Sequence, residues 1–311
     1  MSKFPLNDDT PYYMTSFSRK DFILLVLLTL VWGFNWPIMK IGVTDFPALT
    51  FRILGTFGAL PVLWLAARSQ GMSMAIPKGQ FMTVVHLAIP NVLFWNLFMI
   101  LGITTLSSGR SAILGYTMPV WVVVFGMILF REMPNKIAWL GIACATLGTL
   151  LLLSSEFDRI SGQPLGSILM LAAAASWGYG TLRMRRTKLE MTNIVLTFWM
   201  VLLASIVMGV IALIFEGHLW HMPTLPQWLS IAYNAILVFG FAFVVWFRLA
   251  RILPPVASGL SVMMIPVVGV FSGAWMLGET PYWQDHCAMV LILVSLGTVL
   301  IKPSKTKSDA S

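Results

Sequence analysis

The chain is divided into apolar runs that are each about twenty residues long and contain few charged residues. A transmembrane helix needs about 20 predominantly apolar residues to cross the hydrocarbon core of a bilayer. Charged residues make up only 10% of the chain, whereas they make up about 25% of an ordinary soluble domain. So few charges cannot cover the surface of a water-soluble fold. We therefore expect an all-α integral membrane protein whose surroundings are the lipid bilayer.

A window of about 19 residues finds ten candidate spans. Their approximate ranges are 22–41, 46–67, 81–103, 107–130 and 136–154 in the first half, and 164–183, 192–215, 227–250, 254–277 and 283–301 in the second. With ten spans both termini lie on one side, and 16 of the 20 basic residues fall in segments on that side. Because cytoplasmic loops carry an excess of Lys and Arg, we expect cytoplasmic termini and a multi-pass protein of a bacterial-type inner (plasma) membrane. The cations stand at the ends of apolar runs rather than in one patch, so no nucleic-acid partner is expected.

One stretch of the chain is nearly written twice. Residues 117–134 read TMPVWVVVFGMILFREMP, and residues 264–281 read MIPVVGVFSGAWMLGETP. In each copy a glutamate follows a proline by thirteen residues, and a second proline follows two residues later. VWGFNW from Val31 and SWGYGT from Ser176 match at a similar spacing. Five spans fall in each half, and five is odd, so we expect the halves to run in opposite directions. Such inverted repeats are typical of secondary transporters, with a substrate site near the midplane.

The motif LVWGFNWPIMKIG in the first span resembles the first-helix signature of the EamA family of the drug/metabolite transporter (DMT) superfamily. The arginine of LTFRILG and the two proline–glutamate–proline stretches, each followed by a G…LGT helix, resemble that family as well. The resemblance implies ten transmembrane helices in two inverted five-helix repeats, 22–154 and 164–301. A cytoplasmic segment 1–21 precedes them and a cytoplasmic tail 302–311 follows. It also implies a central cavity lined mainly by helices 1, 3, 4, 6, 8 and 9, and members commonly export amino acids or other small metabolites.

The repeated stretch supplies candidates for coupling or gating. Glu132 and Glu279 each directly precede a new helix, where an acid can cap the helix N-terminus; a role in coupling or gating is the alternative. Pro119 and Pro266 fall in the middle of their spans and are expected to kink them, which suits a gate or simply shapes the cavity. His86 lies inside the span 81–103 and is the candidate for proton coupling, although a lone histidine is more often only hydrogen-bonded.

Two arginines in the first half have no counterpart in the second. Arg52 and Arg110 both lie in the outer part of their spans, with Lys40 at a similar level. An arginine within a span costs from about 2.5 kcal/mol upward unless it snorkels or is paired. One interpretation is snorkelling to the headgroups or pairing with Asp45. The other is an electropositive outer vestibule that binds the carboxylate of a substrate, for which the guanidinium fork is well shaped.

Aromatic and amide side chains complete the candidate substrate site. They are Trp32, Asn35 and Trp36 on helix 1, Asn91 and Trp95 on helix 3, Thr117 on helix 4 and Trp177 on helix 6. Mixed polar and aromatic faces in a bundle usually point to protein or a cavity rather than to lipid. Trp32 and Trp177 occupy matched places well inside their spans, and we expect them to line the cavity.

These features favour an inner-membrane secondary transporter that exports small metabolites, such as amino acids or related amphipathic carboxylates, by alternating access. A multidrug or other metabolite permease or exchanger of the same fold is the alternative. A channel would need a charged ring or a carbonyl filter, and an enzyme would need a positioned base, nucleophile or metal cluster. The sequence shows neither, so no catalytic residue, cofactor or metal is expected. The carrier is expected to act as a monomer or homodimer, and proton antiport and facilitated exchange both fit the sequence.

Overall fold

The computed structural model describes residues 19–131, 133, 136–157, 164–246 and 255–300, and every regular element within them is helical. Apolar surroundings favour this outcome because a helix satisfies its backbone N–H and C=O groups within one segment. The elements of the first half are α1 (Arg19–Val43), α2 (Ala48–Ser69), α3 (Phe81–Ala88), η1 (Ile89–Phe94), α4 (Trp95–Thr105), α5 (Ser108–Gly115), α6 (Met118–Phe130) and α7 (Lys136–Phe157). The elements of the second half are α8 (Pro164–Arg186), α9 (Asn193–Glu216), η2 (Gly217–Leu219), α10 (Leu225–Ala232), η3 (Tyr233–Ala242), α12 (Pro255–Leu277) and α13 (Trp283–Leu300).

Seven helical segments of the described chain are long and apolar enough to cross a membrane. They are Arg19–Val43, Ala48–Ser69, Phe81–Thr105, Ser108–Phe130, Pro164–Arg186, Asn193–Leu219 and Leu225–Trp246. The three other spans expected from the sequence coincide with α7, α12 and α13. The protein is therefore a helical, multi-pass membrane protein.

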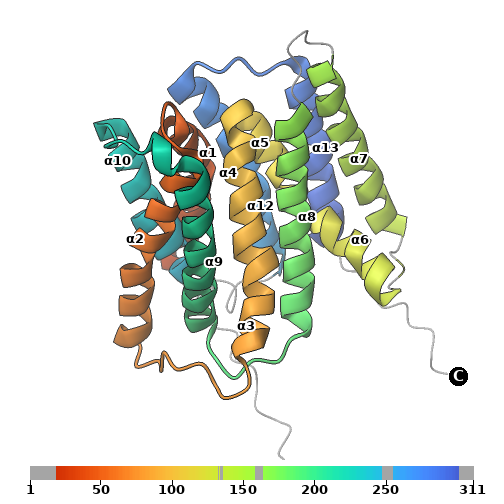
Figure 1. Cartoon of the computed structure of the whole chain (residues 1–311). Helices are drawn as coiled ribbons and strands as arrows, with labels where there is room; N and C mark the ends of the chain where they lie inside the picture. The colour runs from red at the N-terminus through yellow and green to blue at the C-terminus, as the bar shows by residue number, and fades with distance from the viewer. Residues whose placement is uncertain (1–18, 132, 134–135, 158–163, 247–254, 301–311) are drawn as a thin grey trace, which may run out of the picture.

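The helices stand side by side in a bundle (Figure 1). In that view the α1–α2, α4–α5, α9–α10 and α12–α13 connections lie at the upper end, and the α2–α3 and α8–α9 connections lie at the lower end. We call these ends the upper and lower faces. Neighbours in the bundle come from opposite halves of the chain: α7 packs on α13, α1 on α12, α2 on α9, and α4 on α8. Folding thus interleaves the two halves rather than setting them apart as separate domains.

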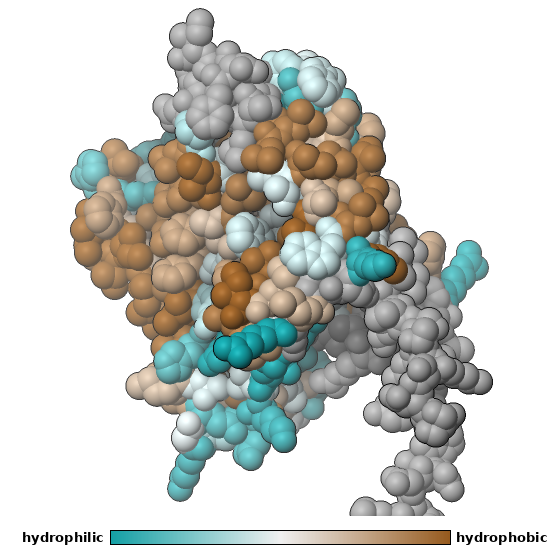
Figure 2. Space-filling model, turned by 90° about the vertical axis from the view of Figure 1, so that its right-hand side faces the viewer, coloured by the Kyte–Doolittle hydropathy of each residue, from teal (hydrophilic) through white to brown (hydrophobic). Residues whose placement is uncertain are grey.

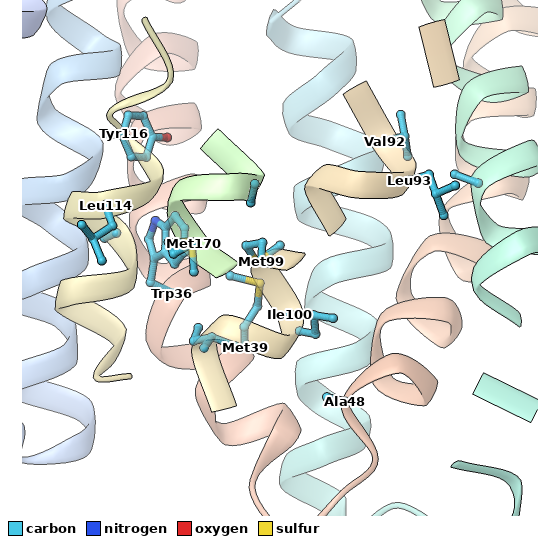
Figure 3. Close-up of a cluster of buried hydrophobic side chains, with 14 of the residues drawn as sticks. Trp36, Met39, Ala48, Val92, Leu93, Met99, Ile100, Leu114, Tyr116 and Met170 are labelled. Carbon is cyan, nitrogen blue, oxygen red and sulfur yellow. The ribbon is translucent and has the colours of Figure 1, made fainter. Parts of the chain in front are cut away.

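Large apolar side chains cover the outside of the bundle as well as its core. Figure 2 shows a broad hydrophobic surface, with hydrophilic residues gathered toward the lower end. On α9, for example, Ile214 and Phe215 are 67% and 66% exposed. Inside, Trp36, Met39 and Ile100 belong to one continuous apolar cluster drawn from both halves (Figure 3). An apolar exterior of this kind is stable only against lipid.

Three of the spans are interrupted along their length. The α3–η1–α4 and α10–η3 spans each contain a π-helical stretch, a feature found frequently at functional sites. The α5–α6 span is broken by a turn at Tyr116 and Thr117, and Pro119 lies in the first turn of α6. A proline fits the first turn of a helix, because the N–H that it lacks would have no partner there. The position of Pro119 directly after the break is consistent with this preference. Helix α12, in contrast, continues through Pro266 without interruption.

Candidate functional site

Arg52 lies in the second turn of α2 and is the largest fully buried side chain of the described residues. The start of α2 is held by Glu216, the last residue of α9, whose carboxylate accepts hydrogen bonds from the N–H groups of Leu49 (2.9 Å) and Thr50 (2.8 Å). A carboxylate at this position satisfies free N–H groups and complements the helix dipole. Glu216 thereby fixes the point from which Arg52 extends into the bundle.

The Arg52 guanidinium points between α1, α4 and η3. Its Nη1 donates to Asn234 Oδ1 at 3.2 Å, while its Nη2 lies 2.7 Å from Met39 Sδ and 3.6 Å from Met99 Sδ. The ring of Phe239 lies 5.6 Å from the guanidinium carbon. These groups are all uncharged, and the expected alternative of a pair with Asp45 is not among the contacts of this side chain. We call Arg52 with Met39, Met99 and Asn234 the Arg52 cluster.

Arg110, on α5, has a different environment. Its Nε donates to Asp285 Oδ1 at 2.7 Å, and the two side chains are only 5% and 6% exposed. Asp285 lies in the first turn of α13 and also accepts from the N–H of Tyr282 at 2.7 Å. Lys40, which the vestibule hypothesis groups with the two arginines, instead donates to the carbonyl oxygens of Ile103 (2.8 Å) and Thr104 at the end of α4. The three cations expected in one vestibule thus have three separate sets of partners.

Glu279 caps a helix other than the one it precedes. Its carboxylate accepts from Ser108 N (2.7 Å), Ser108 Oγ (2.8 Å) and Gly109 N (3.2 Å), all at the start of α5. The expectation that Glu279 caps its own following helix is corrected here, since Asp285 serves the start of α13. Glycine at 278, with φ of +65°, lets the chain turn back toward α5 at this point. Glu132, its partner in the repeat, lies outside the described residues.

A cavity of about 210 Å³ opens beside these contacts on the upper face. Glu279, Arg110, Asp285 and Tyr282 line it on one side, and Thr105, Gly109 and Val270 lie among its other lining residues. Charged side chains share this lining with apolar ones such as Leu106 and Val270, so the cavity has room and polar partners for water or a small polar group. Arg52 is not part of its lining.

The aromatic residues proposed for the substrate site form separate groups. Trp32 packs against Phe243 (ring centroids 6.1 Å apart) and Trp246 (5.8 Å). Trp177 meets Trp95 edge-on at 5.2 Å. Trp36 is almost fully buried in the apolar core beside Tyr116, with ring centroids 6.5 Å apart. The structure thus brings Trp95 and Trp177 together, whereas Trp32 and Trp36 stand in other groups.

The amide side chains are buried and only partly satisfied. Asn91 Nδ2 donates to Leu87 O at 2.9 Å within its own helix, and Asn35 Nδ2 contacts Met39 Sδ at 3.4 Å. The Oδ1 atoms of Asn35 and Asn91 have no hydrogen-bond donor in the described part of the chain. Thr117 Oγ1 donates to Leu114 O at 2.7 Å, at the turn between α5 and α6. His86 is exposed on α3 and shares no contact with this interior set.

Comparison with known proteins agrees with a helical membrane protein. The EamA-like transporter family model matches residues 20–154 and 164–301. The chain belongs to the EamA-like transporter family. It is 28% identical over 279 residues to the uncharacterized transporter YoaV of Bacillus subtilis (strain 168), covering 89% of this chain and 92% of that one. It is 27% identical over 291 residues to the uncharacterized inner membrane transporter YedA of Escherichia coli (strain K12), covering 90% and 92%.

A third relative carries a more specific name. The "probable amino-acid metabolite efflux pump" of Escherichia coli (strain K12) is 26% identical over 295 residues, covering 90% of this chain and 94% of that one. A crystal structure with a TM-score of 0.63 and 18% identity covers 90% of this chain and 96% of the other. At that identity the likeness concerns the fold alone. Together these comparisons identify a membrane transporter, and one of the three relatives is named an inner membrane transporter.

Sequence reasoning missed three residues that organise this region. Glu216 and Asp285 stand at span ends, where acids are ordinarily solvated, and their partners lie 167 and 175 residues away. Asn234, which accepts from Arg52, lies in a long apolar run of the second half. A single buried amide in such a run is a usable signal, because polar side chains are rare there. Nothing local to the sequence indicates which residue each of the three contacts.

Proposed function

We propose that this protein is an inner-membrane secondary transporter that exports small metabolites, such as amino acids or related amphipathic carboxylates, by alternating access. In this proposal ten spanning helices form two inverted five-helix repeats, both termini are cytoplasmic, and the upper face is the outer face. Three features support the proposal: matched packing of the two halves, contacts that can close one face, and residues and relatives that suit a substrate class.

The observation that carries the proposal is a pair of close helix contacts. One contact becomes the other when each residue is replaced by the matched residue of the other half. A Cβ placed on Gly33 of α1 would collide with Val268 of α12. A Cβ placed on Gly178 of α8 would lie 2.7 Å from Trp121 Cβ of α6. Gly33 matches Gly178 in the repeat, and Trp121 matches Val268, so the second contact is the first with the halves exchanged. Small residues that let helices approach this closely are typical of membrane bundles.

The wider packing supports the same exchange. The contact of α2 with η3 has its counterpart in that of α9 with α3 and η1. Three further pairs, α2 with α9, α5 with α12, and α7 with α13, each join matched helices of the two halves. A bundle with this pattern can pack in two equivalent ways, one with each half in the role of the other. Alternating access by rocking of one repeat against the other uses that equivalence.

The contacts at the upper face supply a means of closure. Glu279 ties the α12–α13 connection to the start of α5, and Arg110 ties α5 to Asp285 of α13. We call these two contacts the upper-face lock. Charge-assisted hydrogen bonds of this kind are stronger than neutral ones, yet they are made by side chains at the end of the bundle that can separate without unfolding it. In the proposal they hold the outer face closed and separate when it opens.

The substrate class has support from the name of one relative and from the buried amide and aromatic side chains. One relative covering 90% of this chain is named a probable amino-acid metabolite efflux pump. A multidrug or other metabolite permease or exchanger of the same fold is the second candidate, since the other two relatives are named only as transporters. The buried amides and aromatic side chains of α1, η1 and α8 suit small amphipathic molecules.

Counterflow in proteoliposomes tests the proposal. Vesicles preloaded with a mixture of unlabelled amino acids are given the labelled mixture outside, with and without a pH gradient. A carrier accumulates label faster when the inside is loaded, and the pH-gradient arm reports proton coupling. Flux that does not saturate indicates a channel. No flux of any amino acid contradicts the proposed substrate class, and the same vesicles then test labelled cationic drugs.

A further inference from the structure

We propose that Arg52 is the residue that binds the carboxylate of the substrate, and that the protein leaves this guanidinium without a counter-ion so that the substrate can supply one. The inference rests on the proposed transport function and deepens it by naming the recognised group. It also separates Arg52 from Arg110, which the sequence places in the same role.

The two buried arginines differ in one respect, which is the presence of a carboxylate. Arg110 contacts Asp285 at 2.7 Å. Arg52 is 1% exposed, and within the described part of the chain every group that it contacts is uncharged. A buried ion is stable when it is paired and hydrogen-bonded, and it is costly otherwise. The fold thus provides an anion for one arginine and omits it for the other, at similar burial.

The groups around Arg52 are also weak partners. Two of its three hydrogen-bond acceptors are the thioether sulfurs of Met39 and Met99, which accept poorly. The third is a neutral amide, and among the described residues the Arg52 Nε has no acceptor. A guanidinium offers five N–H donors in a fork that matches the two oxygens of a carboxylate. A substrate carboxylate would therefore be a better partner than any group that contacts Arg52 in the closed protein.

The sulfur contacts can be exchanged for a ligand. Methionine is unbranched and flexible, so it fills a gap in a core and leaves it at low cost. Met39 and Met99 lie next to each other in the core cluster of Figure 3, one on α1 and one on α4. Both sulfurs lie against the same guanidinium nitrogen, Nη2. Movement of these two side chains exposes the donors without moving α2.

The opposite side of the guanidinium is held firmly. Asn234 is the second residue of the π-helical stretch η3, and its Nδ2 is fixed by Ser230 O at 3.0 Å. A Cβ on Gly55 would lie 3.2 Å from Asn234 Cβ, so α2 and η3 are in close contact here. Asn234 therefore orients Nη1 of Arg52 and leaves the other donors for a ligand.

A neighbouring acceptor completes a site for an α-amino acid. Met39 Sδ contacts both Arg52 Nη2 (2.7 Å) and Asn35 Nδ2 (3.4 Å), so Asn35 borders the same cluster. Asn35 is 9% exposed, and no described residue donates a hydrogen bond to its Oδ1. An ammonium group beside the carboxylate would supply that donor. The cluster thus fits a zwitterion, with the carboxylate at Arg52 and the ammonium at Asn35.

The test compares each α-amino acid with its α-amide, which keeps the side chain and the ammonium but removes the negative charge. L-Leucine and L-leucinamide, together with 4-methylpentanoate, are added to the purified full-length protein, and binding is measured from the shift in thermal unfolding midpoint. Competition in the counterflow assay is measured in parallel. We expect the parent protein to bind leucine at least tenfold more tightly than leucinamide. In Arg52→Gln the two should bind equally, and in Asn35→Leu the preference of leucine over 4-methylpentanoate should fall.

Three further variants keep the test decisive. Arg52→Lys retains the charge without the fork and should show a reduced ratio of leucine to leucinamide affinity. Arg52→Met should leave the unfolding midpoint of the ligand-free protein unchanged or raise it, because an unpaired buried ion is replaced by an apolar side chain of similar length. Leu63→Ala, a fully buried change farther along α2, should lower the midpoint and keep the ratio, which separates loss of packing from loss of recognition.

The outcomes separate this inference from the transport proposal. If Arg52→Gln and Arg52→Lys keep the parental ratio, or the parent transports leucine and leucinamide equally, Arg52 does not bind the carboxylate and the carrier function stands. If no amino acid is transported but 4-methylpentanoate binds the parent and not Arg52→Gln, the amino-acid substrate class fails and the carboxylate site stands. If neither leucine nor 4-methylpentanoate binds the parent, the inference is overturned.

Discussion

The change Glu279→Gln tests the upper-face lock with the smallest alteration of shape. In the structure the carboxylate accepts three hydrogen bonds from Ser108 and Gly109 at the start of α5. Hydrogen bonds to a charged group contribute about 1.5–3 kcal/mol each, and a negative charge at a helix N-terminus adds about 0.3–1 kcal/mol. Glutamine keeps one acceptor oxygen but turns an amide donor toward the donors of α5. Because Glu279 is partly exposed, we take a low total, about 2–3 kcal/mol lost from the closed form.

That loss corresponds to a fall of roughly 30- to 150-fold in the ratio of closed to open protein. A cysteine at Val270 reports it, because Val270 is 2% exposed and lines the upper-face cavity. Val270→Cys is introduced after replacement of the free cysteines Cys144 and Cys287. Labelling of intact cells by a membrane-impermeant maleimide should then be faster in Glu279→Gln by the same factor, up to the rate of a fully exposed thiol.

Glu190→Gln provides the matched control for this measurement. Glu190 is an exposed glutamate in the α8–α9 connection at the lower face, so the same chemical change is made far from the lock. The cysteine at position 270 should be labelled at the same rate in Glu190→Gln as in the parent. If folded Glu279→Gln also labels at the parental rate, these hydrogen bonds do not hold the upper face closed, and the proposed lock is wrong.

Two other substitutions have expected effects on stability, measured as the free energy of unfolding in a denaturing detergent titration. Asp285→Asn leaves the Arg110 guanidinium buried beside a neutral group and should cost about 3–5 kcal/mol of stability. Adding Arg110→Met to this variant should restore most of that loss. A double variant as unstable as Asp285→Asn would contradict this account. Gly178→Ala should cost about 1–3 kcal/mol because the new Cβ would lie 2.8 Å from Met118 O. Gly209→Ala, where the nearest atoms are 4.0 Å away, should be neutral or stabilising by up to about 1 kcal/mol, and equal effects at the two glycines would refute the close contact.

The spans were the most predictable part of the structure, because they depend on the length of local apolar runs. The expected span 192–215 is helix α9 at Asn193–Glu216, and the expected span 46–67 is α2 at Ala48–Ser69. The membrane class and the EamA-like family followed from the same runs and from short motifs within them. These features are local in sequence, and so they can be recognised without knowing how the helices pack.

The partners of the charged side chains were not predictable in this way. Arg52 and Arg110 have similar surroundings in the sequence, each near the start of an apolar run, and nothing there shows that only Arg110 has a carboxylate partner. Likewise Glu279 precedes α13 in the chain but caps α5, because the bundle places the start of α5 next to the α12–α13 connection. Which acid meets which donor is decided by helix packing between residues more than 160 positions apart.

The sequence by itself therefore determined that the chain crosses a membrane as helices, approximately which residues belong to each apolar run, and that its two halves share short motifs. The physical reason is that transfer of apolar side chains into lipid and hydrogen bonding along a helix are both short-range in sequence. Only the tertiary structure decided that one buried arginine is neutralised and the other is not. That distinction comes from contacts across the interleaved halves, and it is the observation from which we propose that Arg52 binds the carboxylate of the substrate.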